Sequence, residues 1–82
     1  MYSFLKIVNR TSYPAISVED DDRLLAGQIL SGEASPTFTL SAGSLSLLIR
    51  QHTGRPFLSI WMAMPPDTQK ILVIEDETAF FA

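Results

Sequence analysis

The sequence predicts an all-β protein, an antiparallel β-sandwich of about seven short strands with little or no helix. Apolar and polar residues alternate along several short runs, which is the period of a strand with one buried face. Turn residues separate these runs at intervals of about 8–12 residues, as in sandwiches and barrels. No segment repeats apolar residues at i, i+3, i+4 and i+7 over the length of a helix. The 82 residues fit one domain, so we expect residues 1–82 to form a single sandwich.

The first strand is expected over residues 2–8, which are apolar and rich in β-prone side chains. Leu5 and Ile7 fall on one face of this strand, which we expect to meet the core, and Phe4 and Val8 fall on the opposite face. Polar residues then interrupt the alternation, so a loop follows.

A short hairpin is expected next. Residues 15–19 form its first strand, with Ile16 and Val18 facing inward. The aspartates at 20–22 favour a chain reversal, because like charges repel and Asp side chains bond to backbone groups in turns. Residues 23–26 are then the return strand.

The middle of the chain is interpreted as a crossing segment followed by a second hairpin. Residues 27–34 mix Gly, Ser and Glu, which predicts a crossing segment with one short strand or bulge. Residues 35–51 alternate on both sides of Ala42 and Gly43 and read as a β-hairpin that pivots there. Leu48 breaks the alternation and makes the second strand apolar on both faces. The residues expected to face inward are Phe38, Leu40, Leu45, Leu47 and Ile49.

Two further strands are expected over residues 57–64 and 70–74. A Gly- and Pro-containing turn at 52–56 precedes the first, and two prolines end it because they remove consecutive ladder donors. The acidic run 75–77 closes the second, and the tail 79–82 is short and apolar. The inward residues of the first strand are Leu58, Ile60, Met62 and Met64.

Several of these strands carry apolar side chains on both faces, whereas a sandwich needs only one apolar face per strand. A monomer rarely exposes contiguous apolar patches beyond a few hundred Å², so we expect the tail, a second copy or a ligand to cover the outer residues. We predict a homo-oligomer. Alternatively, some strands are buried on both faces, or the registers shift by one residue, which exchanges the faces without removing the excess. The predicted interface residues are Phe4, Leu48, Phe57, Trp61, Leu72, Ile74, Phe80 and Phe81.

Charge and composition exclude several classes of partner. The net charge is −3 and the six basic residues are scattered, which disfavours nucleic acid and anionic membrane. There is no cysteine for a disulfide or a thiolate metal site, and no apolar run reaches the ~20 residues that membrane insertion requires. The first ten residues lack the features of a signal peptide, so we expect a cytoplasmic location by default, with a signal removed beforehand as the alternative.

The residues that could carry chemistry do not form a catalytic or metal-binding set, and we predict no catalytic, cofactor or metal residues. The acidic runs 19–22 and 75–77 could supply oxygens to Ca²⁺, but they lack the spacing of a calcium loop and are interpreted as solvated turns. His52 is the only histidine, which rules out a two-histidine metal site. Arg50, His52 and Arg55 could together bind one anion, although an exposed loop is the simpler interpretation.

Two weaker possibilities concern sugars. The sequence Asn9-Arg10-Thr11 matches an N-glycosylation acceptor, and without a secretory signal we take the match as chance. Trp61 and Tyr13 could stack on a sugar ring or another small molecule, because aromatic faces suit such ligands. Our preferred function is a non-enzymatic interaction or structural module that self-associates, with an unidentified protein partner left open; small-molecule or carbohydrate binding by Trp61 and Tyr13 is the alternative.

The order of the turn motifs resembles that of a widespread, uncharacterised bacterial family of small β-sandwich modules. Its members open with V-x-N-A-S-P-x-A-P-x-V-D-V-Y, which residues 8–18 resemble, and continue with a hairpin, a G-E-A/V-S segment and a P-A-G turn. Here Gly-Glu-Ala-Ser at 32–35, Ser-Ala-Gly at 41–43, the strand end at 47–50 and the strand 57–64 stand in the same order. The V-D-V-Y aromatic has no counterpart. The resemblance implies an immunoglobulin-like or transthyretin-like sandwich in an envelope-associated structural or binding module, and it offers no catalytic residues.

Overall fold

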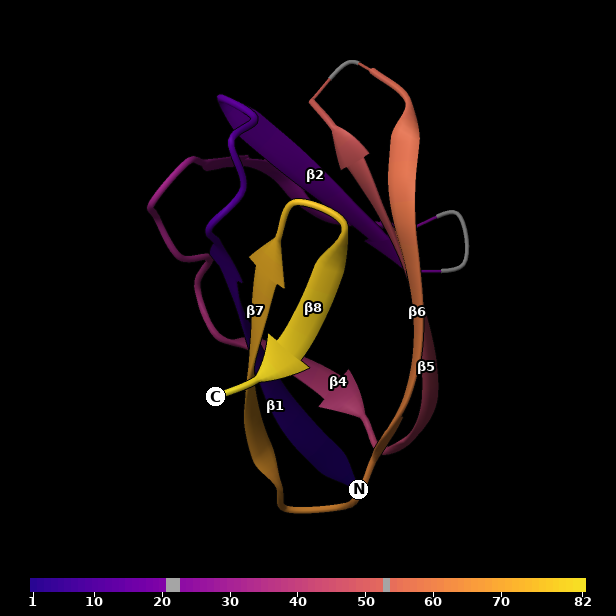
Figure 1. The fold of residues 1–82 in the computed structure, drawn as a ribbon. Helices are drawn as coiled ribbons and strands as arrows, with labels where there is room; N and C mark the ends of the chain where they lie inside the picture. Colours follow the sequence, from indigo (N-terminus) through magenta and orange to yellow (C-terminus); the bar gives the residue numbers. More distant parts are fainter. Residues whose placement is uncertain (21–22, 53) are drawn as a thin grey trace.

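The computed structural model describes residues 1–20, 23–52 and 54–82, and within them the chain forms two four-stranded sheets packed as a β-sandwich (Figure 1). One sheet, here the β1 sheet, has the order β4-β1-β7-β8, and the other, the β2 sheet, has the order β3-β2-β5-β6. The β1 sheet contains β1 (Tyr2–Asn9), β4 (Phe38–Ser41), β7 (Gln69–Glu75) and β8 (Thr78–Phe81). The β2 sheet contains β2 (Ala15–Asp20), β3 (Arg23–Leu30), β5 (Gly43–Gln51) and β6 (Pro56–Met64).

The predicted all-β sandwich is confirmed, with two differences. The described residues contain no helix and eight strands rather than about seven, because the apolar tail forms β8 against β7. Not every pair is antiparallel: β1 and β7 run parallel in the centre of their sheet.

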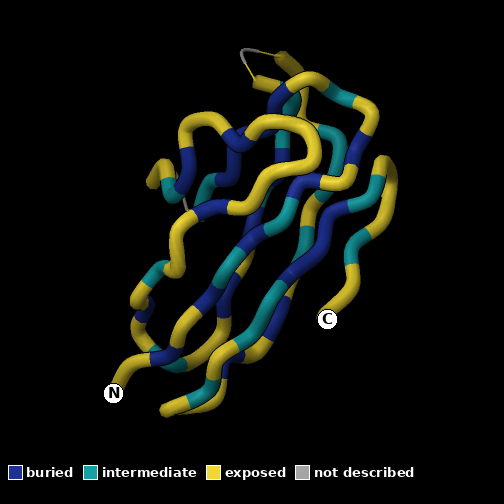
Figure 2. Tube along the Cα trace, turned by 90° about the vertical axis from the view of Figure 1, so that its left-hand side faces the viewer, coloured by how far each residue is buried: buried dark blue, intermediate teal, exposed yellow. Residues whose placement is uncertain are grey.

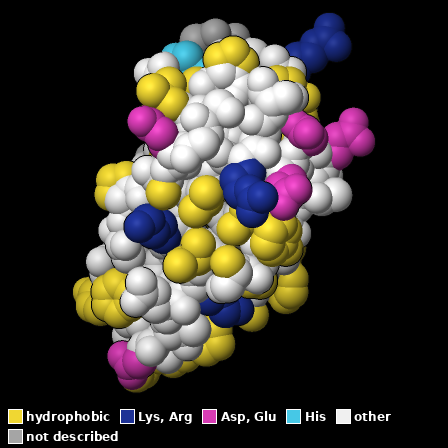
Figure 3. All heavy atoms as spheres, turned by 60° about the vertical axis from the view of Figure 1, so that its left-hand side comes forward, with side chains coloured by type: hydrophobic (Ala, Val, Ile, Leu, Met, Phe, Trp, Pro, Cys, Tyr) yellow, Lys and Arg dark blue, Asp and Glu magenta, His cyan; other side chains and the backbone are white. Residues whose placement is uncertain are grey.

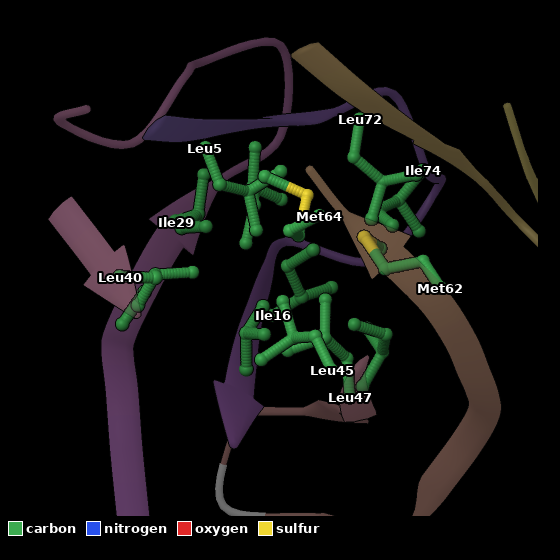
Figure 4. Packing of buried hydrophobic residues seen from close by; sticks show 14 residues of the cluster. Leu5, Ile16, Ile29, Leu40, Leu45, Leu47, Met62, Met64, Leu72 and Ile74 are labelled. Carbon is green, nitrogen blue, oxygen red and sulfur yellow. The ribbon is translucent and has the colours of Figure 1, made fainter. Parts of the chain in front are cut away.

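The core lies between the sheets and is filled by the inward faces that the alternation predicts. Leu5 and Ile7 from β1 and Ile16 and Val18 from β2 are fully buried there. In the tube of Figure 2, buried and more exposed residues alternate along the strands, and the side chains labelled in Figure 4 converge from both sheets. The remaining predicted core residues also belong to this cluster or pack against it: Phe38, Leu40, Leu45, Leu47, Ile49, Leu58, Ile60, Met62 and Met64.

The hairpin predicted over residues 35–51 is wrong. β4 pairs with β1, whereas β5 pairs with β2 and β6, so the chain crosses from one sheet to the other at Ala42 and Gly43. Gly43 has a φ of 136°, which suits glycine, and the Ala42 N–H donates to the Met1 carbonyl. Although β4 and β5 belong to different sheets, each turns one face to the same core. Apolar and polar residues therefore alternate along them as they would in a hairpin.

The predicted outward position of Leu72 and Ile74 is also wrong, because both side chains are buried in the core. Residues 70–74 contain a continuous apolar run, and periodicity alone does not say which alternate set faces inward. The pairing of β7 with β1 decides it, since Leu72 lies beside the core residue Ile7. Ile71 and Val73 therefore take the outer face.

The return strand predicted over 23–26 extends to Leu30 as β3. β3 has two register shifts against β2, and the one between Ala26 and Ile29 corresponds to the irregularity expected after residue 26. The hairpin itself is confirmed by the Asp20–Arg23 pair. The expected turn residues Asp21 and Asp22, and Thr53 in the next predicted turn, lie outside the described residues.

Candidate functional site

Apolar side chains from three neighbouring strands lie on the outer face of the β1 sheet, and we call this surface the apolar face. Val8 lies beside Val73, and Val73 lies beside Phe80, so one apolar row crosses three strands. Ile71 and Phe4 extend the surface on the Lys6 side of this row. Phe4 and Phe80 remain 37% and 43% exposed. Val73, at the centre of the row, is itself only 5% exposed, whereas Phe4 and Phe80 present part of their surfaces to water.

Charged residues lie on both sides of this apolar row. Lys6 lies beside Ile71, two residues before the row on β1, and Glu75 lies two residues after it on β7. Neither side chain belongs to an ion pair within the described parts of the chain. Figure 3 shows one side of the molecule on which hydrophobic side chains cluster around Lys or Arg side chains. The apolar face thus has a basic group on one side and an acidic group on the other.

The outer face of the β2 sheet is more polar. Arg50 on β5 pairs with Glu19 on β2, with 3.2 Å between Nε and Oε1, and Arg50 Nη2 donates to the other carboxylate oxygen. Ser44, Ser46 and Ser59 occupy further outward positions on β5 and β6. Leu48, Trp61 and Ala63 are the apolar residues there, and Trp61 is 70% exposed.

The predicted interface residues therefore do not share one surface. Phe4 and Phe80 lie on the apolar face, while Leu48 and Trp61 lie on the outer face of the β2 sheet. Leu72 and Ile74, as corrected above, are in the core.

Phe57 was also placed wrongly on an outer face. A register shift between Ile49 and Arg50, opposite the start of β6, turns Phe57 so that it packs against the core cluster and against Tyr13. The ring centroids of Phe57 and Tyr13 are 4.7 Å apart. Sequence alternation does not reveal such a bulge.

Phe81 lies at the side of the sandwich between β8 and β6 rather than on an outer face. Its partner on β7 is the inward residue Leu72, so Phe81 points to the same side. Lys70 Nζ lies 4.6 Å from the centre of the Phe81 ring and donates to the Ala63 carbonyl oxygen on β6. Lys70 thus connects the edges of the two sheets.

The alternative binding site made of Trp61 and Tyr13 is not assembled. Tyr13 lines a hollow of about 240 Å³ with residues that include Pro14, Leu30 and His52, and Trp61 does not line it. The two rings are carried by different parts of the molecule, since Tyr13 packs on Phe57 while Trp61 projects from the outer face four residues further along β6.

The possible anion site of Arg50, His52 and Arg55, which we considered less simple than an exposed loop, is not formed as a cluster of available donors. Arg50 already binds Glu19. His52 Nδ1 lies 3.0 Å from the Gly27 carbonyl oxygen; a carbonyl only accepts, so Nδ1 carries the proton.

The acidic runs end up in separate contacts. Asp20 pairs with Arg23 at 3.5 Å, and Asp76 Oδ1 accepts from both the backbone N–H and the hydroxyl of Ser12. These bonds, the backbone one first, lower the pKa of Asp76 below its ordinary value. In the part of the chain that the structure describes, no three Asp, Glu or His side chains form a group that could hold a metal ion.

Asn9 is a structural residue that the sequence analysis treated only as a chance glycosylation match. It is fully buried; Nδ2 donates to the Ile29 carbonyl, and Oδ1 accepts from the N–H and the hydroxyl of Thr11. The Asn-x-Thr spacing is thus that of an Asx turn, which holds the loop after β1 onto β3. The acceptor nitrogen is not accessible to a glycosyl group.

Comparisons with protein-family models, with curated proteins and with solved structures found no match. Within the described ranges, no helix has the length and hydropathy needed to cross a membrane. The chain's own surfaces therefore carry the functional argument.

Proposed function

We propose that this protein is a non-enzymatic β-sandwich interaction module that self-associates, with the apolar face of the β1 sheet as the surface on which two copies meet. The observation that carries the proposal is the pair of exposed side chains Phe4 and Phe80 on the outer side of the β1 sheet, around the apolar row Val8–Val73–Phe80. An outward face of this kind is normally polar unless another surface covers it.

The distribution of charge favours a second copy as the covering surface. Two sheets that pack face to face lie about 10 Å apart, with side chains interdigitating between them. The apolar row runs across the strands. A two-fold axis parallel to the row, between two such faces, places the row of one copy on the row of the other and reverses the direction of the strands. The Lys6 end of one copy then lies over the Glu75 end of the other. Opposite charges therefore face each other across the interface, as a self-complementary isologous contact requires.

The expected association is weak. Burying a phenylalanine completely contributes about 1.5–3 kcal/mol, so the remaining exposed parts of Phe4 and Phe80 contribute about 1 kcal/mol each per copy. Much of this gain offsets the loss of rotational and translational freedom on association. We therefore expect a dimer that dissociates in the micromolar to millimolar range, about 4–8 kcal/mol.

The turn motifs described from the sequence support the same class of function. Their order is similar to that of the bacterial family of small β-sandwich modules, whose members are similar to immunoglobulin-like or transthyretin-like sandwiches. We propose a relation to that family, and it favours a structural or binding role over catalysis.

The test is sedimentation equilibrium from about 10 μM to about 1 mM. Phe80→Ser should weaken association through the apolar face by tenfold or more, whereas Leu24→Ser, at a 59% exposed site on β3, should leave this interface unchanged. Lys6→Glu and Glu75→Lys should each weaken association, and the double exchange should restore it. Arg10 directly follows β1 and adds a positive charge at the Glu75 end, so the single charge reversals alone do not isolate the Lys6–Glu75 contact. The double exchange is therefore the decisive comparison. A mass of one chain at every concentration would refute the proposal, and so would equal effects of Phe80→Ser and Leu24→Ser.

A further inference from the structure

The free edge of β6 differs from the other three sheet edges. β6 spans nine residues, has no charged side chain, and has its only proline at the first position. β4 and β8 are four residues each, and β3 begins with Arg23 and has two register shifts against its neighbour. Short strands, bulges and charges are the usual devices that prevent an edge from pairing with another chain. In β6 the one register shift lies at its start, at Phe57, and from Leu58 to Met64 the strand has neither a charge nor a register shift.

The burial of the inward side chains shows which part of this edge is open. Met62 and Met64 are 4% and 1% exposed, and Lys70 covers the same end by donating to the Ala63 carbonyl. Leu58 and Ile60 face the same core yet stay only partly buried. The uncovered segment therefore contains Leu58 to Trp61.

In the segment from Leu58 to Trp61, the backbone N–H and carbonyl groups of alternate residues point to the free edge of β6. The Ala63 carbonyl, which Lys70 reaches from outside the β2 sheet, is directed to the free edge. Along a strand the edge-directed groups recur at every second residue, so Trp61 and Ser59 also present an N–H and a carbonyl there.

We propose that β6 pairs with β6 of a second copy, antiparallel, to join the two β2 sheets into one continuous eight-stranded sheet. A two-fold axis beside Ile60 places Ser59 opposite Trp61 of the second copy, and Trp61 opposite its Ser59. These are the positions whose backbone groups point outward, so the register forms the hydrogen bonds of an antiparallel ladder.

The side chains fit this register on both faces. On the outer face the indole of Trp61, now 70% exposed, lies over the small Ser59 of the second copy, which Leu48 flanks on the neighbouring strand. On the inner face Ile60 meets Ile60 across the axis, which covers the partly buried end of the core. The segment carries no charge that a two-fold axis would bring against itself, so a second copy of this chain is the occupant that the edge fits.

This contact is separate from the apolar face of the β1 sheet and rests on different residues. A chain with both two-fold interfaces assembles beyond a dimer, into a closed tetramer or a longer array. The Phe80→Ser background removes the first interface and leaves only the β6 contact to be measured.

The experiment uses Trp61 itself, the only tryptophan of the chain, as the probe. In Phe80→Ser we expect the sedimentation mass to rise toward two chains with concentration, Trp61 fluorescence to shift to the blue over the same range, and the amides of Ser59 and Trp61 to exchange more slowly. Adding Trp61→Lys should return the mass to one chain. Adding Leu24→Lys instead, on the opposite edge strand, should leave the dimer intact.

Other outcomes overturn the proposal. A Phe80→Ser protein that stays monomeric at about 1 mM shows that β6 does not pair. A mass that rises without a change in Trp61 emission or in the two amides places the contact elsewhere. Circular dichroism checks the fold of each variant; if Trp61→Lys fails to fold, Ser59→Lys puts a charge on the same edge at an exposed site, and a dimer that survives Ser59→Lys also refutes the pairing. If Lys6, Glu75 and Phe80 variants all associate as the unaltered chain does while Trp61→Lys does not, the proposed function through the apolar face fails and the β6 contact stands.

Discussion

Replacing Ser3 by alanine should stabilise the protein, whereas replacing Ser35 by alanine should destabilise it. Both serines are buried; Ser3 is part of β1, and Ser35 lies beside this strand. Ser3 is fully buried, and its hydroxyl oxygen has no hydrogen-bond partner among the residues that the structure describes. Ser35 Oγ accepts from the Ile7 N–H at 2.9 Å and donates to the Pro36 carbonyl at 2.7 Å. The serine hydroxyl supplies an acceptor for Ile7 where β1 has passed the end of β4.

The magnitudes follow from these contacts. A buried hydroxyl without a partner costs about 1–3 kcal/mol, so Ser3→Ala should raise the free energy of unfolding by about 1 kcal/mol after the small loss of packing. Ser35→Ala leaves the buried Ile7 N–H without an acceptor and should lower it by about 1–3 kcal/mol. For a domain of this size each kcal/mol shifts the melting temperature by about 4–8 °C, so the two variants should separate clearly.

Urea denaturation measures both changes, with Ser46→Ala at an exposed outer position of β5 as the control. The comparison needs equal m values, because a changed m reports a changed denatured or native state rather than the deleted group. If Ser3→Ala destabilises the protein as much as Ser35→Ala does, the Ser3 hydroxyl has a partner and the reasoning is refuted.

Two further predictions concern the ends of the strands. Asn9→Ala removes the bonds to Ile29 and Thr11 and should lower the free energy of unfolding by about 2–4 kcal/mol in the same assay; a loss below about 1 kcal/mol would show that water replaces the amide. The pKa of Asp76 lies below its ordinary value of 3.8, so its contribution to stability is present above pH 3.8 and is lost as the pH falls through the folded-state pKa. Ser12→Ala removes the hydroxyl donor and should raise the pKa of Asp76 in an NMR titration of its carboxyl carbon, and an unchanged titration would contradict the assigned hydrogen bond.

The inward faces of most strands could be predicted from the sequence because each face repeats with a period of two. Leu45, Leu47 and Ile49 required no knowledge of their partners to be placed in the core. The pairing of the strands could not be predicted in this way. An alternating segment before Gly43 and another after it are compatible with one sheet or with two, and only the contacts of β4 with β1 distinguish them.

The candidate surfaces were predicted in part for the same reason. The excess of apolar side chains was visible, and Phe4 and Phe80 lie on an outer face as expected. Leu72 lies in a run that is apolar on both faces, so its assignment depended on the register with β1. Phe57 depended on a bulge, and Tyr13 on the loop that carries it to Phe57. None of these contacts has a signal in the local sequence.

The two sheets differ in where they leave apolar groups uncovered. The outer face of the β2 sheet carries serines and the Glu19–Arg50 ion pair beside Leu48 and Trp61, and the backbone groups that no described strand pairs with lie along the edge at β6. The β1 sheet ends in the four-residue edges β4 and β8, and its uncovered apolar groups are Phe4 and Phe80 on the outer face. A chain of 82 residues, 46% of them hydrophobic, leaves a larger share of its apolar surface outside the core than a longer chain does. Because that surplus is divided between a face and an edge, a substitution that removes one contact should leave a dimer through the other, and only a variant altered at both should be monomeric.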